Sequence, residues 1–435
     1  MDLPVIARRL RTRVTPRPVW AMPAATVGVL LIGFALQLLV YGNGGHSSLS
    51  DLPHLVLGRG IGPDALPYLD RPLEYPVGSG LLFYLATLVT TSPLGVLIVT
   101  AVAATATCVV ITVALERRVG ARAWRWAVGT PVLLFAFQNW DVFAIAAMVF
   151  GILAFDRGNS SRAGVWLGVG AFVKLFPAFV IPPLVISRWA RGDRRGAVRL
   201  AGAGAVTFAV LNLPVLVANP SGWWYPLDFQ SQRQTTWGTV WHYGFRIVGA
   251  PVSGTAGSHF ANAVCLVALV IGLGWLSIVA VRRRLEPFPI AAVAVAVFVL
   301  TNKVYSPTYD VWLVPFFVLL AVPRRVWVGF CAVDLAIYVL VFGYFHGLTS
   351  RDEVHMLLPV FVFVRAALLV ALVVIAVRPG SRPESSGSTP VLDGDPAAER
   401  RDRGGVETDR PPVDAEGRTQ EGDGQLVDRR KRLLR

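Results

Sequence analysis

Apolar stretches separated by short polar turns recur along the chain from Val19 to Val377. Several of them contain the roughly 20 apolar residues that an α-helix needs to cross a bilayer. The pattern predicts helical arms over residues 20–40, 77–91, 93–115, 197–218, 259–281, 287–302, 309–322, 326–345 and 356–377, with further arms between 125 and 187. We therefore expect an all-α polytopic membrane protein with about twelve transmembrane or half-spanning helical arms.

Residues 125–187 form shorter arms of about 12–16 residues each, too short to cross a bilayer fully. Arginine-containing turns at 156–162 and 188–199 bring the chain back twice to the same side, so each leg is predicted to be a hairpin. The two tips fall at QNWD (138–141) and KLFP (174–177). Non-helical backbone at such depth must line a cavity or be buried in protein.

Charge fixes the expected orientation. The whole chain carries a net charge of +14, and residues 1–378 hold 30 Lys and Arg against 15 Asp and Glu. Most of that excess lies in short loops, at 8–17, 116–125, 187–199, 282–284 and 323–325. Short arginine-rich loops mark the cytoplasmic side of a membrane protein. The positive charge therefore indicates topology and not nucleic-acid binding, and both termini are expected to be cytoplasmic.

Three regions follow from this pattern. Residues 1–19 are predicted to be a basic cytoplasmic N-terminus, and residues 20–378 a membrane domain with outer loops at 42–76 and 219–258. Residues 379–435 are rich in Pro, Gly, Ser, Asp and Arg and have few apolar residues. Such a segment cannot bury enough surface to order itself, so we expect a disordered cytoplasmic tail, which ends in RRKRLLR and is able to touch anionic lipid.

Two isolated lysines are the first candidates for chemistry. The chain has 38 arginines and three lysines, and two of the lysines, Lys174 and Lys303, fall at predicted outer hairpin tips followed closely by proline. A cation within a membrane is costly and usually functional, and a compact ammonium suits a phosphate group. The alternative is a lysine that extends its side chain to the headgroup region.

The first outer loop supplies candidate acids. Within SDLPHL (50–55) and PYLDRPLEYP (67–76) lie the carboxyl groups of Asp51, Asp64, Asp70 and Glu74. A carboxylate beside an apolar cavity can act as a general base. A solvated loop with ordinary surface acids is the alternative.

Other polar residues have two interpretations each. The loop at 219–246 is dense in Trp, Tyr, Gln and Arg, which suits either sugar stacking or an aromatic belt at the membrane interface. Its Arg233 is able to hold an anion bidentately. Asp141 in QNWD either orients a sugar hydroxyl or caps the helix that follows. Asp334 and Arg365, both in mid-span, are expected to pair with each other or to face the cavity.

The order of these motifs resembles a known family. An aspartate after the first span, EYP (74–76), NWD (139–141), KLFP (174–177), FQSQRQTTW (229–237) and NKVYSPTY (302–309) are together similar to the polyprenyl-phosphate-mannose-dependent mannosyltransferases of glycosyltransferase family 87, within the GT-C superfamily. The similarity covers roughly residues 20–377. It implies a GT-C-type helical bundle, a lipid-linked sugar donor, an extracytoplasmic active site in the plasma membrane, and inverting transfer without a metal ion or other cofactor.

The resemblance also implies residue roles. Asp51 matches the catalytic aspartate of the first loop, with Asp70 as second choice, because the tyrosine often found soon after that aspartate is missing from DLPHLVLG. Lys174, Lys303 and Arg233 match the positions that bind the donor phosphate. The residues expected to contact the sugar or the acceptor are Glu74, Tyr75, Asp141, Gln230, Trp237, His242 and Tyr309.

The sequence thus predicts a membrane glycosyltransferase. Its donor is a polyprenyl-phosphate sugar, mannose or alternatively arabinofuranose, and its acceptor a glycolipid or cell-envelope glycan. A transporter or flippase of lipid-linked sugars is the rival class, because broken helices with charges at their tips also form transport sites. A non-catalytic scaffold fits less well, since buried cations are expensive to retain.

Overall fold

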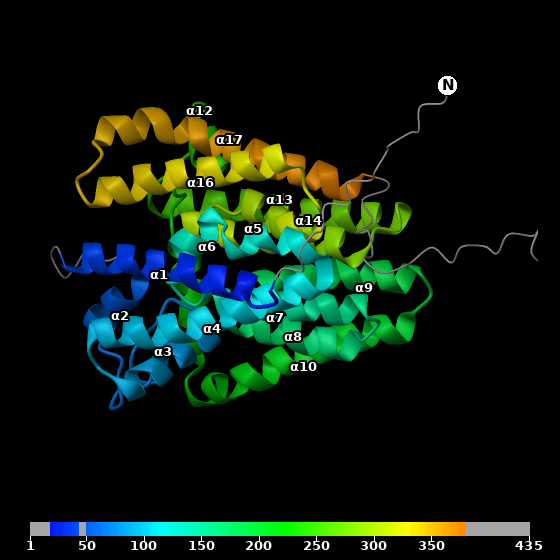
Figure 1. Cartoon of the computed structure of the whole chain (residues 1–435), viewed down its shortest axis with the longest axis horizontal. Coiled ribbons are helices and arrows are strands. Elements are labelled where there is room, and N and C mark those ends of the chain that lie inside the picture. Colours follow the sequence, from blue (N-terminus) through cyan, green and yellow to red (C-terminus); the bar gives the residue numbers. More distant parts are fainter. Residues whose placement is uncertain (1–17, 43–48, 379–435) are drawn as a thin grey trace, which may run out of the picture. The chain divides into compact units, whose positions relative to one another are not determined.

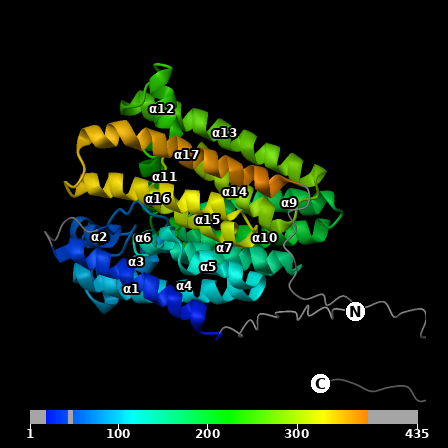
Figure 2. The same ribbon diagram turned by 45° about the horizontal axis from the view of Figure 1, so that its top comes forward.

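A computed structural model of the chain describes residues 18–42 and 49–378. The predicted disordered tail (379–435) and nearly all of the predicted basic N-terminus lie outside the described residues. Within them every regular element is helical, apart from two isolated β-bridges between residues 62 and 71. The all-α prediction is therefore confirmed for this part of the chain (Figures 1 and 2).

Six helices in the described ranges are long and apolar enough to cross a membrane. They are α1 (Ala21–Gly42), α4 (Pro93–Val119) with its continuation to Ala127, α10 (Arg194–Ala218), α13 (Gly254–Arg282), α16 (Arg324–Phe345) and α17 (Arg351–Val377). The most apolar 18 residues of each of these helices are only 17% to 44% buried inside the protein. Much of this apolar surface is therefore exposed. Because water-exposed apolar surface on this scale is unfavourable, the chain is a multi-pass membrane protein.

The remaining helices are short. In chain order they are α2 (Asp51–Arg59), α3 (Val77–Val89), η1 (Gly120–Ala123), α5 (Trp124–Ala127), α6 (Thr130–Phe135), α7 (Asp141–Asp156), α8 (Ser160–Val173), η2 (Phe176–Val180), α9 (Ile181–Ala190), α11 (Pro220–Gln232), α12 (Val240–Ile247), α14 (Pro287–Thr301), η3 (Pro307–Tyr309) and α15 (Asp310–Leu319). Of these, α7, α14 and α15 are almost entirely buried, so they form the centre around which the long helices pack.

The two predicted hairpins are present, and their tips lie where the sequence indicated. α6 and α7 flank QNWD, and α8 ends at Lys174, whose extended backbone (φ −147°, ψ 138°) stops the helix. Pro177 lies in the first turn of η2, where the missing proline N–H breaks no hydrogen bond. The sequence at this tip thus ends one helix and starts the next.

α8 and α10 run parallel and pack closely. A Cβ atom on Gly164 would lie 2.4 Å from the carbonyl oxygen of Leu200, and one on Gly168 would lie 2.7 Å from that of Gly204. Side chains at these two positions would push the helices apart, so glycine sets their separation. Gly164 faces Leu200 and Gly168 faces Gly204, so the contacts advance in the same direction along both helices. Both helices therefore begin at the same end of the bundle.

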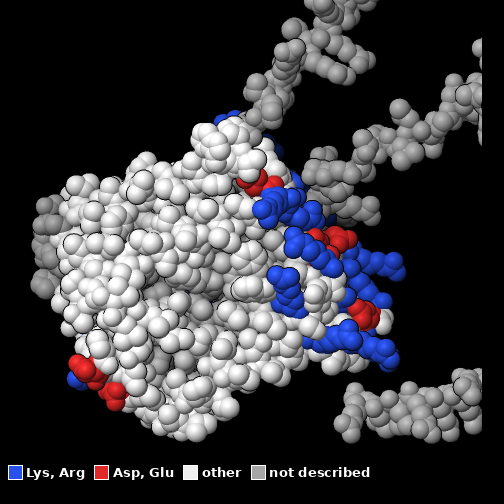
Figure 3. Space-filling view, turned by 60° about the horizontal axis from the view of Figure 1, so that its bottom comes forward, with Lys and Arg blue, Asp and Glu red and all other residues white. Residues whose placement is uncertain are grey.

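The arginine-rich turns meet at that end. Arg118 pairs with Asp156 at 3.1 Å, Arg191 donates to the carbonyl of Leu285, and Arg283 donates to the carbonyl of Val377 at 2.8 Å. In the view of Figure 3 most of the blue side chains gather at one end of the molecule. The surface between this end and a small charged group at the other end is white. α8 separates this end from Lys174 by 14 residues, a rise of about 21 Å.

Candidate active site

Asp51 is placed by hydrogen bonds to the first hairpin tip. It opens α2, and the hydroxyl of Ser50 caps that helix by accepting from the N–H of Leu52. The same hydroxyl is 2.8 Å from the carbonyl of Phe137, and the Asp51 N–H donates to the carbonyl of Gln138 at 2.9 Å. The start of α2 is therefore fixed to the main chain of Phe137 and Gln138, at the first hairpin tip.

The other end of α2 is tied to the segment before α3. Arg59 forms an ion pair with Glu74 at 2.8 Å. Tyr75 comes next, and its hydroxyl donates to the Asp51 carboxylate at 2.6 Å. The side-chain amide of Gln138 lies 3.5 Å from the other Asp51 oxygen. Two elements that are distant in sequence thus orient one carboxylate, which is itself only half-buried.

Tyr75 reaches Lys174 because α3 docks on the end of α8. The Ser79 hydroxyl donates to the carbonyl of Val173 at 2.8 Å, and a Cβ on Gly78 would lie 2.6 Å from the Phe172 ring. This contact places the Lys174 ammonium 4.9 Å from the centre of the Tyr75 ring. A cation at this distance is attracted to the ring face.

The two hairpin tips meet through an ion pair. The Lys174 ammonium lies 2.8 Å from Asp141, whose side chain is 1% exposed. Asp141 is the first residue of α7, but Asn139 supplies the side-chain oxygen that accepts an N–H there, at 3.0 Å from the Asp141 nitrogen. The side-chain contact of Asp141 is therefore with Lys174. The capping alternative is wrong, because the N-cap of α7 is Trp140 and no side chain caps this helix.

Tyr309 completes this group of side chains. It lies within electrostatic range of Lys174, Arg233, Asp141 and Asp51. Its ring stacks on Trp312 with 3.9 Å between centroids, and Trp312 stacks on Phe176 of the second tip. We call Asp51, Tyr75, Lys174, Arg233 and Tyr309 the tip cluster. All five are half-buried, so each keeps some surface for a ligand.

Lys303 lies beside Arg233 and contacts main chain. Its ammonium donates to the carbonyls of Ser231, at 3.0 Å, and Arg233. Burial lowers the pKa of Lys303 to about 8. The Arg233 guanidinium is 3.4 Å from the Gln230 amide oxygen, and Gln230 is exposed. Lys303 therefore holds the end of α11, from which Arg233 projects.

A buried network supports the segment after Arg233. Arg365 forms an ion pair with Asp310 at 3.1 Å and donates to the Gly238 carbonyl at 2.6 Å. The Tyr305 hydroxyl also donates to Asp310. The sequence indicated that Arg365 and Asp334 either pair with each other or face the cavity. In the structure both are buried, α16 places Asp334 beside Asp310, and the guanidinium pairs with Asp310.

Three further predicted residues, Asp70, Trp237 and His242, make contacts with residues outside the tip cluster. Asp70 is exposed and accepts the Leu66 N–H at 2.8 Å, which closes a turn of its own loop. Trp237 packs on Tyr344 and His355, with ring centroids 5.9 and 5.6 Å away. His242 is buried, 3.0 Å from the Thr235 hydroxyl. Among the described residues no group of three or more His, Cys, Asp or Glu is placed to hold a metal ion.

A sequence profile decides the family. The profile of glycosyltransferase family 87 matches residues 73–307, more than half of the chain. The chain belongs to glycosyltransferase family 87. The matched region contains Tyr75, Asp141, Lys174, Arg233 and Lys303, whereas Asp51 precedes it. In this family 87 chain, Asp51 is joined to the matched region by its contacts with Tyr75 and Gln138.

Two other comparisons add context. The crystal structure of ArnT from Cupriavidus metallidurans bound to undecaprenyl phosphate is similar to this family 87 chain, at 16% identity and a TM-score of 0.41, over 82% of this chain and 76% of ArnT. No curated protein sequence matches the chain.

Sequence reasoning overlooked several residues of the site. Gln138 belongs to the QNWD motif, but only Asp141 of that motif was selected. Trp140 is fully buried between Tyr75 and Phe83, with ring centroids 5.3 and 5.6 Å away, so it supports the Tyr75 ring. The dipeptide Ser50–Asp51 is a helix-start signal that indicates how Asp51 is oriented.

Proposed function

We propose that this family 87 enzyme transfers a sugar from a polyprenyl-phosphate donor to a hydroxyl of a glycolipid or cell-envelope glycan. The observation that carries the proposal is that Asp51 and Lys174 face the same phenol, Asp51 at its hydroxyl (2.6 Å) and Lys174 at its ring (4.9 Å). A carboxylate to remove a proton and a cation to bind a phosphate are thus combined within one small cluster.

In the proposed reaction Asp51 is the general base. The acceptor hydroxyl gives its proton to the Asp51 carboxylate as its oxygen bonds to the anomeric carbon. The bond between that carbon and the phosphate oxygen breaks, and the electron pair leaves with the polyprenyl phosphate. Attack from the face opposite the leaving group inverts the configuration. Tyr75 and Gln138 orient the carboxylate toward the acceptor, which a positioned base requires.

Lys174 and Arg233 bind the donor phosphate. Negative charge grows on this phosphate as the sugar leaves, and fixed cations stabilise such charge with little reorganisation. Lys174 carries three N–H donors, so it is able to keep Asp141 and contact a phosphate oxygen at once. Lys303 contributes by holding the end of α11 and by its positive charge beside Arg233.

Aromatic and polar groups position the sugar rings. The Tyr309 ring is braced by Trp312, which is 3% exposed, and by the Phe176 ring behind it. A half-exposed, supported ring of this kind suits stacking against a pyranose. Glu74 pairs with Arg59 and Asp141 with Lys174, so the two acids orient these cations. Gln230, Trp237 and His242 shape the segment around Arg233.

The tip cluster is proposed to face outside. Arginine-rich turns gather at the opposite end of the bundle, and short loops of this composition stay in the cytoplasm. Lys174 follows one end of α8 and Ser160 begins the other. With the arginine-rich end in the cytoplasm, the cluster in this proposal lies near the outer boundary of the plasma membrane. No metal ion takes part in the proposed reaction.

The test uses purified full-length protein with synthetic polyprenyl phosphates that carry mannose or arabinofuranose, plus a membrane-lipid extract as acceptor. A product heavier by one hexose, found by mass spectrometry with the mannosyl donor, is expected. An increase of one pentose with the arabinosyl donor would replace mannose as the sugar. Asp51→Asn should abolish transfer, whereas Asp70→Asn should keep it. The opposite result would assign the base to Asp70.

A flippase for lipid-linked sugars remains the rival, and the charged pair at two broken-helix tips is the observation that favours it. The same purified protein in liposomes distinguishes the two. Movement of a labelled donor between leaflets without any glycolipid product would support the flippase and contradict sugar transfer.

A further inference from the structure

A charged cavity lies at the arginine-rich end, far from the tip cluster. It has a volume of about 540 Å³. Its lining residues come from the turns before α8 and α10, from the first turns of these two helices and from the end of α9. Four of the lining residues are arginines: Arg157, Arg188, Arg195 and Arg199. Asp193 is the one acid among the described residues that line it. The cavity therefore carries a positive net charge.

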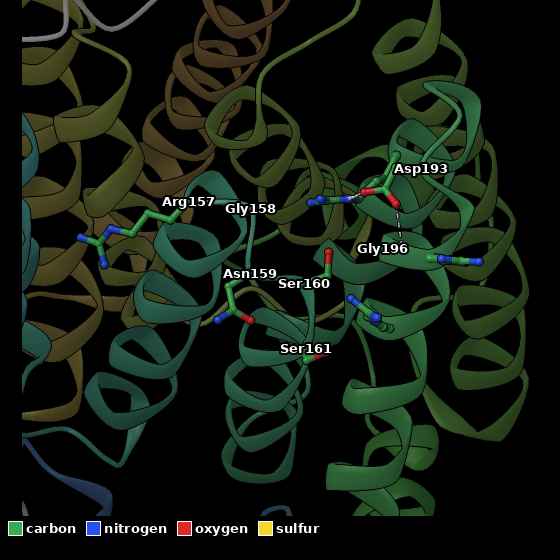
Figure 4. Close-up of a pocket in the computed structure, with 10 residues that line it drawn as sticks. Arg157, Gly158, Asn159, Ser160, Ser161, Asp193 and Gly196 are labelled. Atoms are coloured by element: carbon green, nitrogen blue, oxygen red, sulfur yellow. Dashed lines mark hydrogen bonds and ion pairs between the residues drawn. The ribbon is translucent and has the colours of Figure 1, made fainter. Parts of the chain in front are cut away.

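Asp193 is already engaged by neighbours within the protein. One of its oxygens is 2.6 Å from the Arg188 Nε, and the other accepts the Gly196 N–H at 2.7 Å (Figure 4). Both contacts restrain the carboxylate against the start of α10. Arg157, Arg195 and Arg199 line the cavity and are exposed, and in Figure 4 the Arg157 side chain extends away from Asp193 and Gly196.

Two helix N-termini border this cavity. α8 begins at Ser160 and α10 at Arg194, and because the helices are parallel their N-termini lie at the same end. A helix N-terminus bears a partial positive charge and unpaired N–H groups, which favour phosphate. Asn159 and Asp193 each accept one N–H at these termini, those of Arg162 and Gly196. The Asp193 carboxylate also offsets the charge of the α10 terminus, so the positive charge of the cavity comes from the α8 terminus and the four arginines.

The Ser160 hydroxyl is an independent sign of a ligand. Ser160 is 5% exposed, and within the described residues its Oγ has no hydrogen-bond partner. In Figure 4 this hydroxyl points toward the side of the cavity where Asp193 and Gly196 lie. Buried polar groups nearly always have a partner, so an unpaired one on a cavity wall indicates a missing acceptor. Arginines that only set membrane orientation need no such hydroxyl.

We propose that this cavity binds a phosphate group, with the Ser160 hydroxyl and the guanidinium groups of Arg195 and Arg199 as donors. Arginine offers paired N–H donors that match phosphate oxygens. Two sources fit this chemistry: the headgroup of an anionic phospholipid beside the helices, or a free phosphate compound in the adjoining water. The site is distinct from the tip cluster, because α8 separates them by its full length.

The experiment measures binding of two probes to full-length protein in detergent. Native mass spectrometry follows phosphatidylglycerol against phosphatidylcholine, and calorimetry follows inorganic pyrophosphate. The test variants are Ser160→Ala and the double variant Arg195→Gln/Arg199→Gln. Arg324→Gln/Arg325→Gln is the matched control, because these two exposed arginines start α16 outside the cavity.

We expect the double variant to weaken binding of one probe by about tenfold or more, since hydrogen bonds to charged groups are among the stronger ones. The control should keep the native affinity. Loss confined to phosphatidylglycerol identifies a lipid headgroup, and loss confined to pyrophosphate identifies a soluble phosphate; each supports the site. Equal affinity of native protein, test variants and control for both probes, or no binding of either probe to native protein, overturns it.

Ser160→Ala gives a second readout. Removing a hydroxyl that lacks a protein partner should leave the melting temperature of the ligand-free protein unchanged or higher, because an unsatisfied buried group is lost. Its affinity for the bound probe should nevertheless fall. A clear drop in melting temperature without any probe would show that the hydroxyl serves the fold, and would overturn its role as a ligand donor.

Discussion

The Lys174 ammonium lies 2.8 Å from the Asp141 carboxylate, and this contact joins the tips of two hairpins that are separate in sequence. Asp141 is 1% exposed and the Lys174 side chain 12%. Removing one member of such a pair leaves the other charge buried without its partner. The pair is therefore expected to matter for both stability and catalysis, and the two contributions are separable.

Lys174→Met should lower the free energy of unfolding by about 3 kcal/mol, the usual penalty for an orphaned buried charge. Donor-dependent activity should disappear. The double variant Lys174→Met/Asp141→Leu should regain much of the melting temperature, because no charge remains unpaired, yet stay inactive. Thermal unfolding followed by dye binding, together with the transfer assay, checks both. Recovery of activity in the double variant would contradict phosphate binding by Lys174.

Tyr75→Phe removes the hydroxyl that orients Asp51 and keeps the ring beneath Lys174. We expect kcat to fall about tenfold, the equivalent of one hydrogen bond to a charged group, with little change in KM for the donor. Desolvation, and next the charge of Asp51, raise the pKa of Tyr75 well above its usual value. The phenol therefore remains a donor at alkaline pH, and the kcat ratio of native to variant enzyme should stay constant there.

Tyr84→Phe is the matched control, since Tyr84 is a half-buried tyrosine of α3 outside the tip cluster. It should keep the native kcat. An equal fall in both variants would show that the loss comes from packing of α3 and not from the contact with Asp51.

The lowered pKa of Lys303 predicts that a rise in pH weakens donor binding and increases the stability of the protein. Burial lowers its pKa to about 8, below the usual value of 10.5. As the pH rises through about 8 the folded protein loses this charge beside Arg233, so KM for the donor should rise. Between about pH 8 and the usual lysine pKa of 10.5, the unfolded state binds more protons than the folded state. The free energy of unfolding therefore rises with pH in this window.

Initial rates and melting temperatures measured over the same pH series check this prediction. Lys303→Arg, which stays charged throughout, should abolish the alkaline rise in KM. A rise that persists in this variant would assign the titration to another group.

Gly238→Ala tests the segment that carries Arg233. A Cβ at this position would lie 2.1 Å from the carbonyl oxygen of Tyr305, and Arg365 donates to the Gly238 carbonyl. We expect a loss of about 1–3 kcal/mol in stability from overpacking and a higher KM for the donor. Gly244→Ala is the control, because nothing lies within 4 Å of a Cβ there. Comparable losses in both variants would contradict the role of this close approach.

The sequence was most informative where a local signal has one physical meaning. Lys174 followed by Pro177 correctly indicated a hairpin tip, because proline favours the first turn of a helix and the apolar arms on each side are too short to cross a bilayer. Lys174 was selected as an isolated lysine in an apolar run. Asp51 was one of four acids in the first outer loop and was selected by the resemblance, and the structure places the two in one cluster.

Contacts between distant helices were beyond such reasoning. Arg365 and Asp334 both lie mid-span, which suggested that they pair with each other or face the cavity, yet the partner of Arg365 is Asp310 at the start of α15. Which of two buried acids meets a guanidinium depends on the rotation and depth of packed helices, and neither is written in a local pattern. The same holds for Lys303, whose partners are main-chain carbonyls that no sequence motif marks.

The anchoring of α2 on main-chain oxygens has a consequence for variation among relatives. Ser50 and the Asp51 amide bind the carbonyls of Phe137 and Gln138, which every amino acid possesses. Position 137 is thus free to drift among residues of suitable bulk without displacing the base, whereas Ser50 is not replaceable by a residue lacking a hydroxyl. Homologues are expected to alternate serine with threonine before the aspartate and to exchange Phe137, which is buried against Phe34, only among bulky apolar residues.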